Sequence, residues 1–156
     1  MGFHIRRAQV EDAETACEAV RRSIAVCCHE DHGGDPVRLS AWLGNKTPGS
    51  FRGWIEREGL HCVVAELVDR RIVGFGMAAA GEILLCYVTP EVRFLGVGRS
   101  VLQALERHAV ASGAAELRLE STRTALPFYW RQGYAPSGPA IAFSGMEGHP
   151  LSKRTL

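Results

Sequence analysis

The sequence has no long hydrophobic run and no excess of charge of one sign. No apolar stretch approaches the roughly 20 residues of a membrane-spanning helix, and the apolar start at residues 3–7 is short and soon charged, unlike a signal peptide. The 18 Lys and Arg residues are balanced by 17 Asp and Glu, without a long basic run. We therefore expect neither membrane insertion nor nucleic-acid binding, and a cytoplasmic location.

The cysteines lack the spacing of disulfide or metal sites. The five cysteines are odd in number and include no Cys-x-x-Cys pair, which argues against a disulfide framework. Cys28, His29, Asp31 and His32 are all able to bind metal, but their spacing matches neither His-Glu-x-x-His nor paired Cys-x-x-Cys. We expect free thiols and no metal.

Repeats, low-complexity tracts and linkers are also missing. A chain of 156 residues, 46% of them hydrophobic, suits one domain with a substantial core. Residues 147–156 are polar and contain Gly and Pro, so we expect a loosely held tail after a domain at 1–146.

Hydrophobic periodicity predicts a helical first half and a mixed second half. The predicted strands are 4–7, 62–68, 71–78, 83–88, 116–120 and 140–146. The predicted helices are 10–27, 37–43, 48–58, 97–112 and 124–132. Strands 62–68 and 71–78 are predicted to form a hairpin through Asp69-Arg70.

The most informative segment joins strand 83–88 to helix 97–112 through Arg93-Phe94-Leu95-Gly96-Val97-Gly98. Glycines at 96 and 98 remove the Cβ atoms that would block the approach of a ligand to the backbone. The amides can then point at an anion, at the positive end of the helix dipole. The turn predicts a site for a phosphorylated cofactor, and alone it suits a nucleotide equally well.

A second motif follows, separated from the turn by a helix and a strand. It is Ala125-Leu126-Pro127-Phe128-Tyr129-Trp130-Arg131-Gln132-Gly133-Tyr134. It resembles the Ala-x-x-x-Tyr-x-x-x-Gly-(Phe or Tyr) motif of the GCN5-related N-acetyltransferase (GNAT) superfamily. The turn resembles that family's (Arg or Gln)-x-x-Gly-x-(Gly or Ala). Together, and in the family's order, the two motifs make residues 63–134 similar to this superfamily.

The resemblance implies a single-domain α/β (α+β) fold, with a mixed central sheet of about 6–7 strands and about 4–5 helices. It also implies acetyl-coenzyme A as cosubstrate and a small-molecule or peptide amine as acceptor. The pantetheine arm would pair with the strand before the turn, and the turn would hold the pyrophosphate. Thr122 stands where the family often has Asn, which puts one hydrogen bond in doubt. The implied cofactor-binding residues are Cys86, Tyr87, Val88, Arg93, Phe94, Leu95, Gly96, Val97, Gly98, Arg99, Ser100 and Thr122.

Direct transfer of an acetyl group to an amine needs a hydrogen-bond donor for the oxyanion, a general acid and a general base. The resemblance places the amide of Val88 at the thioester carbonyl and Tyr129 beside the sulfur as general acid. A phenol of pKa about 10 is protonated at neutral pH. Packing in an aromatic cluster is the alternative reading of Tyr129.

The general base is not identified by the motifs, and three residues are candidates for it. Glu82 begins the strand on which the family often has a carboxylate, although a strand-end surface charge is the simpler reading. His29 and His32 lie near the predicted acceptor pocket, where neutral imidazole is a suitable base, but they also suit a frayed helix end. The acidic run at residues 30–35 would attract a cationic amine or form an ordinary polar loop. Trp42 and Trp54 either line this pocket or anchor the core.

Two other classes of protein are alternatives to an acetyltransferase. A dinucleotide-binding oxidoreductase is suggested by Gly96-x-Gly98 with Glu120 further on, but Val101 occupies the third glycine position. A non-catalytic acyl-coenzyme A sensor would keep the turn without needing Tyr129. We therefore expect an N-acetyltransferase whose acceptor the sequence does not identify. A homodimer is favoured by the resemblance alone.

Overall fold

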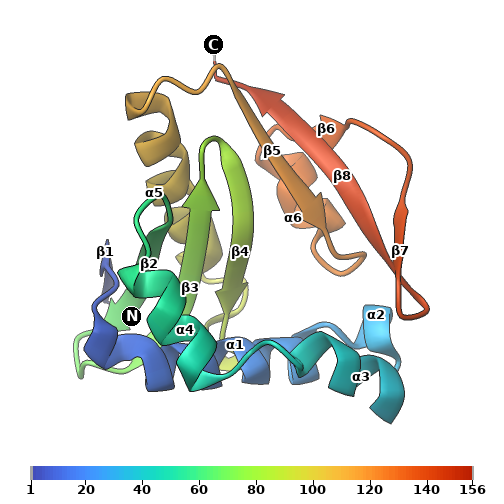
Figure 1. Ribbon diagram of the computed structural model, residues 1–156, viewed down its shortest axis with the longest axis horizontal. Coiled ribbons are helices and arrows are strands. Elements are labelled where there is room, and N and C mark those ends of the chain that lie inside the picture. Colours follow the sequence, from blue (N-terminus) through green and yellow to red (C-terminus); the bar gives the residue numbers. More distant parts are fainter. Residues whose placement is uncertain (1, 156) are drawn as a thin grey trace.

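The computed structural model describes residues 2–155, which form a mixed eight-stranded sheet with helices on both faces (Figure 1). The strand order is β1-β2-β3-β4-β5-β8-β6, with β7 paired to β8. The strands are β1 Phe3–Arg7, β2 His61–Leu67, β3 Ile72–Ala79, β4 Glu82–Val88, β5 Glu116–Ser121, β6 Ala135–Pro136, β7 Ile141–Phe143 and β8 Met146–Arg154. The α-helices are α1 Ala13–Cys27, α2 His29–His32, α3 Pro36–Leu43, α4 Pro48–Glu56, α5 Val97–Ala111 and α6 Leu126–Arg131, and short 3-10 helices cover Val10–Asp12 and Pro90–Val92. The predicted fold class is confirmed.

Two apolar clusters hold the helices against the sheet. Helix α5 buries Val101, Leu102 and Leu105 in one cluster, and α1 and α4 contribute Ile24 and Phe51 to the other. Glycine in β3 lets α5 lie close, because a Cβ at Gly76 would come within 2.6 Å of Val101 and 2.9 Å of Leu105. This close packing places the N-terminus of α5 directly beside the end of β4.

The parallel strands β4 and β5 separate soon after they begin. Their ladder in the described chain pairs Glu82 with Arg118 and Ile83 with Leu119, after which β4 continues to Val88 without β5 beside it. On its other edge β4 stays paired with β3 along its length. One edge of the β4 backbone is therefore left open to a ligand, and in Figure 1 β5 and β8 lean away from β4.

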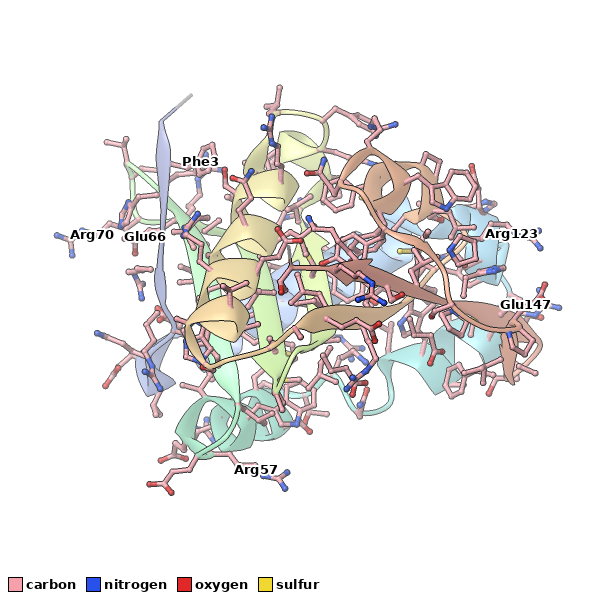
Figure 2. The ribbon with its side chains drawn as sticks, turned by 90° about the horizontal axis from the view of Figure 1, so that it is seen from above. Phe3, Arg57, Glu66, Arg70, Arg123 and Glu147 are labelled. Atoms are coloured by element: carbon pink, nitrogen blue, oxygen red, sulfur yellow. The ribbon has the colours of Figure 1, made fainter. Side chains whose placement is uncertain are left out.

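The prediction of a loosely held tail after residue 146 is wrong. The predicted last strand is split by a turn at Ser144 and Gly145, both with positive φ, and β8 then runs from Met146 to Arg154 between β5 and the short strands β6 and β7. In Figure 2, Glu147 on β8 lies beside Arg123, at the end of the molecule far from Glu66.

Pro150 explains why β8 was missed and how the strand tolerates proline. Its carbonyl accepts a hydrogen bond from the N–H of Ser137, so the side of Pro150 that lacks an N–H faces away from β5. It lies between the residues paired with β7 and those paired with β6. The strand therefore loses no bond to β5 at this residue.

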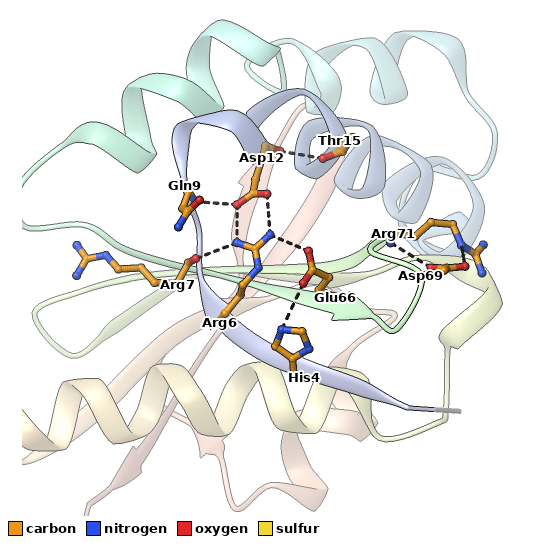
Figure 3. Close-up of polar contacts among 9 residues, drawn as sticks. All are labelled: His4, Arg6, Arg7, Gln9, Asp12, Thr15, Glu66, Asp69 and Arg71. Carbon is orange, nitrogen blue, oxygen red and sulfur yellow. Dashed lines mark hydrogen bonds and ion pairs between the residues drawn. The ribbon is translucent and has the colours of Figure 1, made fainter.

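A partly buried ion-pair cluster holds the beginning of α1 against β1 and β2. The guanidinium of Arg6 on β1 donates to both carboxylate oxygens of Asp12 at 2.8 Å and to Glu66 on β2 at 3.0 Å (Figure 3). The Arg6 hydrogen bonds hold the pKa of Asp12 below its ordinary value. The other end of α1 reaches the opening between β4 and β5, where Ser23 and Cys27 line a cavity. No helix within residues 2–155 has the length and apolarity needed to cross a membrane.

Candidate active site

The separation of β4 from β5 opens a cavity of about 650 Å³. Its walls are the open part of β4, the glycine turn, α6 and the end of α1. The structure thus brings the two sequence motifs together in the wall of one cavity. The predicted site residues that line it are Cys86, Tyr87, Val88, Arg93, Phe94, Gly96, Gly98, Arg99, Thr122 and Tyr129.

The glycine turn presents backbone amides at the N-terminus of α5. Phe94 and Gly96 have positive φ values of 68° and 87°, which reverse the chain before the helix. The first bond of the helix runs from the N–H of Ser100 to the carbonyl of Gly96 at 3.1 Å, so the amides of residues 97–99 precede it and have no intrahelical acceptor. This arrangement can bind phosphate oxygens.

Three arginines line the same cavity. Arg93 lies with its guanidinium 4.7 Å from the ring centre of Phe94, Arg99 lies on the first turn of α5, and Arg131 comes from α6. Arg131 was not among the predicted site residues. It stands two positions after Tyr129, and helical spacing does not place such a pair on one face, so only the fold brings both to the cavity.

Tyr129 is 6% exposed and points its hydroxyl toward the cavity wall that holds Cys86. Burial raises its pKa well above the ordinary value of 10.0. Its ring packs edge-on against Phe128 and Tyr134. The phenol is therefore a fixed and fully protonated donor at neutral pH.

The carboxylate of Asp31 links the helical half to the loop before α6. It accepts the N–H of Arg123 at 2.7 Å, and the N–H and hydroxyl of Thr124 at 3.1 and 2.6 Å. Next to it, the hydroxyl of Thr122 accepts the N–H of Ala125 at 3.0 Å. These bonds span the opening between the two halves of the sheet and set the position from which α6 begins.

We expect Asp31→Ala to lower kcat about tenfold, because loss of hydrogen bonds to a charged group, about 1.5–3 kcal/mol each, frees the α6 loop and with it Tyr129. Affinity for coenzyme A should stay within about threefold, because the glycine turn is untouched. Asp35→Ala is the matched control, since Asp35 caps α3 through Val37. Steady-state kinetics and calorimetric binding measure both. Lost stability with unchanged kcat would leave Asp31 a purely structural role.

The three candidate bases lie away from this cavity. His32 is 1% exposed, its Nε2 is 2.9 Å from the carbonyl of Ile24, and its Nδ1 accepts the N–H of Gly34 at 2.9 Å. Both ring nitrogens are therefore occupied. His29 packs edge-on against His32, and Glu82 lies where β4 is still paired with β5. None of the three is among the described residues that line the cavity.

A smaller cavity of about 140 Å³ adjoins the first and shares Tyr87, Glu120 and Thr122 with it. Its other walls include Trp42 of α3 and Phe143 of β7. Trp54, the other predicted pocket residue, instead packs against Phe51 in the core, with ring centres 4.9 Å apart. Glu120 was not selected as a site residue, because its alternation in β5 is that of an ordinary solvent-facing strand residue.

The described residues contain no group of three or more His, Cys, Asp or Glu side chains arranged to hold a metal ion. Of the thiols that line the larger cavity, Cys28 is buried and Cys27 and Cys86 are partly buried. Burial raises the pKa of Cys86 and that of Cys28 to about 12. Neither group is a thiolate at neutral pH.

The chain matches one protein family by sequence and several solved structures by fold. The family described as acetyltransferase (GNAT) domain matches residues 28–155. No curated protein matches the sequence. A GCN5-related N-acetyltransferase structure from Rhodopseudomonas palustris superposes with a TM-score of 0.86 at 23% identity, covering 99% of this chain and 96% of that one.

Two further structures share the fold. The PaiA N-acetyltransferase of Thermoplasma acidophilum, solved in complex with coenzyme A, has a TM-score of 0.82 at 22% identity, over 99% of both chains. An aminoglycoside 6'-acetyltransferase type Ii has a TM-score of 0.71 at 14% identity, over 98% of this chain and 97% of that one. At these identities the likeness concerns the fold.

Proposed function

Because the chain belongs to the GNAT acetyltransferase family, we propose that it transfers an acetyl group from acetyl-coenzyme A to a primary amine by direct attack on the thioester. The proposal rests on one observation: the glycine turn and Tyr129 line the same cavity, beside the open edge of β4. A phosphate site, an unpaired strand edge and a buried acid are the three features that this reaction needs.

The donor would lie along β4. The open backbone edge at Cys86, Tyr87 and Val88 offers hydrogen bonds to the amides of the pantetheine arm, in the manner of an added strand. The amides of residues 94–100, with Arg93 and Arg99, offer bonds to the pyrophosphate. Arg131 adds a third positive charge for the phosphates of the cofactor. The N–H of Val88 would then face the thioester carbonyl and stabilise the oxyanion.

In the transfer step the nitrogen of a neutral amine attacks the thioester carbon, the C–S bond breaks, and the departing sulfur takes a proton from Tyr129. A thiolate leaving group benefits from such a donor, because general acid catalysis contributes about 10²- to 10⁴-fold. The dry surroundings of Tyr129 keep the proton on its oxygen until the sulfur gains charge.

Turnover of acetyl-coenzyme A with a panel of amines tests this function. We expect release of free thiol that depends on both substrates, with a sequential kinetic pattern and one acetylated amine per thiol. Tight binding of coenzyme A without thiol release to any amine would instead favour the non-catalytic acyl-coenzyme A sensor.

We expect Cys86→Ala to retain kcat within about threefold, because a buried thiol with a pKa of about 12 is not a nucleophile at neutral pH. Rapid-mixing kinetics and intact-protein mass spectrometry should detect no acetylated enzyme before the amine is added. Abolished turnover at unchanged coenzyme A affinity would show that the acetyl group passes through Cys86.

A further inference from the structure

The smaller cavity differs from the larger one in its charges and walls. Where the larger holds arginines, the smaller is lined by three carboxylates and three aromatic rings, in the set Asp31, Glu120, Glu147, Trp42, Tyr87 and Phe143. We propose that this cavity binds a small acceptor amine in its cationic form, and that Glu120 receives the ammonium and takes its proton. The inference rests on the proposed function, since it names the acceptor of the same reaction.

Glu120 lies at the border between the two cavities. Glu120 lines both cavities, together with Tyr87 and Thr122, so these three residues mark the opening where the two meet. Tyr87 is also part of the β4 edge proposed to hold the donor. A group bound against Glu120 therefore lies at the border of the cavity in which the thioester is expected.

Charge pairing singles out Glu120 among the three carboxylates. Both oxygens of Asp31 are occupied by the α6 loop, and Glu147 pairs with Arg123 at 3.3 Å. Among residues 2–155, no Lys, Arg or His forms an ion pair with Glu120. The Glu120 carboxylate is thus the negative charge in this cavity that is left for a ligand.

Gly148 makes the room that Glu120 uses. A Cβ at Gly148 on β8 would overlap the Glu120 carboxylate, so any other residue there would displace it. This glycine has no positive φ that would require it for the backbone. The absent side chain therefore serves to seat the carboxylate.

The remaining walls suit a cation of limited size. Trp42, Tyr87 and Phe143 can offer ring faces to an ammonium or to the methylene groups next to it, a contact worth about 0.5–2 kcal/mol. A cavity of about 140 Å³ is well below the roughly 300–1,000 Å³ of pockets for drug-sized ligands. It fits a short aliphatic amine, or the end of a longer one.

The proton balance is complete with these groups. The ammonium gives one proton to Glu120 and becomes a neutral amine, whose nitrogen then forms a bond to the thioester carbon. The C–S bond breaks and the sulfur takes the Tyr129 proton, while the second proton lost by nitrogen restores Tyr129. Glu120 returns its proton to water, so the products are the acetamide, free coenzyme A and one proton.

A matched pair of acceptors tests the proposal. Propylamine is a cation at neutral pH, and O-ethylhydroxylamine has nearly the same size but is neutral. In Glu120→Gln, we expect kcat/KM for propylamine to fall about 10- to 100-fold, the loss expected for a hydrogen bond to a charged group. The value for O-ethylhydroxylamine should change less than about threefold, as should coenzyme A affinity. Glu116→Gln, on the same face of β5, is the control.

The pH dependence gives a second readout. In the unsubstituted protein, kcat/KM for propylamine should be nearly flat around neutral pH, because the ammonium that predominates there is the form that binds and loses its proton on the protein. In Glu120→Gln it should rise about tenfold per pH unit, because only the free amine reacts. Equal losses for the two acceptors, or no loss for either, would overturn the role of Glu120.

Binding separates this inference from the proposed function. Propylamine affinity for the coenzyme A complex can be measured by calorimetry without any turnover. Weaker binding in Glu120→Gln, with no acetyl transfer by the unsubstituted protein, would support the cation site and reject the transferase. Acetyl transfer that is insensitive to Glu120→Gln would do the reverse. Propylamine that neither binds nor reacts would overturn the cation site.

Discussion

Tyr129→Phe should lower kcat by about 10²-fold or more and leave the dissociation constant of coenzyme A within about threefold. The substitution removes one oxygen and keeps the ring, so the packing against Phe128 and Tyr134 survives. The proton for the departing sulfur must then come from water, to which Tyr129 is almost closed. Stopped-flow thiol release and calorimetric titration measure the two quantities.

Tyr134→Phe is the matched control for this variant. Tyr134 belongs to the same aromatic cluster, but its hydroxyl donates to Glu106 at 2.8 Å, away from the cavity. We expect a loss of about 0.5–3 kcal/mol in the free energy of unfolding and a kcat within about threefold. If Tyr129→Phe also kept full activity, another group would have to supply the proton.

The pH profile provides a further check on Tyr129. Because its pKa is raised above the ordinary value, Tyr129 stays protonated throughout the neutral and mildly alkaline range. The rate should therefore not decline between neutral pH and about 10 through loss of this proton. A decline there that disappears in Tyr129→Phe would show that its proton is lost earlier.

Gly98→Val should weaken coenzyme A binding about 10- to 100-fold without destabilising the fold. A Cβ at Gly98 would lie 3.7 Å from Phe128 and Val88, which is ordinary contact, and its φ is not in the left-handed region. The Cβ carbon therefore fits against the protein, and the two added methyl groups extend from a residue that lines the cavity. They occupy the space where we propose that the cofactor lies, and such overpacking costs about 1–3 kcal/mol.

Gly98→Ala is the graded control, because the family motif accepts Gly or Ala at this position. It should retain cofactor affinity within about threefold and raise the free energy of unfolding by about 0.5–1 kcal/mol, as expected for alanine in a helix. Calorimetry and thermal unfolding test both variants. If Gly98→Val bound coenzyme A normally, the cofactor would have to lie away from the glycine turn.

The donor side of the site could be predicted from sequence because its determinants are local. The turn at residues 93–98 combines glycines, a basic residue and a following helix within a few positions, and the second motif is equally short. Each motif can therefore be recognised from the spacing of its own residues. The helices and most strands were likewise predicted, since their hydrophobic periods are strong.

The acceptor side could not be predicted because its determinants come from distant segments. Asp31 meets Arg123 and Thr124 across 92 and 93 positions of the chain. Only the opening beside β4 distinguishes Glu120 from the other solvent-facing residues of β5. Strand β8 escaped prediction because its polar residues, Gly148 and Pro150 resemble a loop until neighbouring strands supply their hydrogen bonds.

The sequence by itself determined the glycine turn, the helix behind it and the tyrosine of the second motif, because backbone geometry and helix dipoles act over a few residues. Only the tertiary structure decided that β4 and β5 part after Ile83, that Asp31 bridges the opening, and that Glu120 is left without a cation beside it. These features depend on strand pairing and long-range packing, which bring together residues that no local spacing connects.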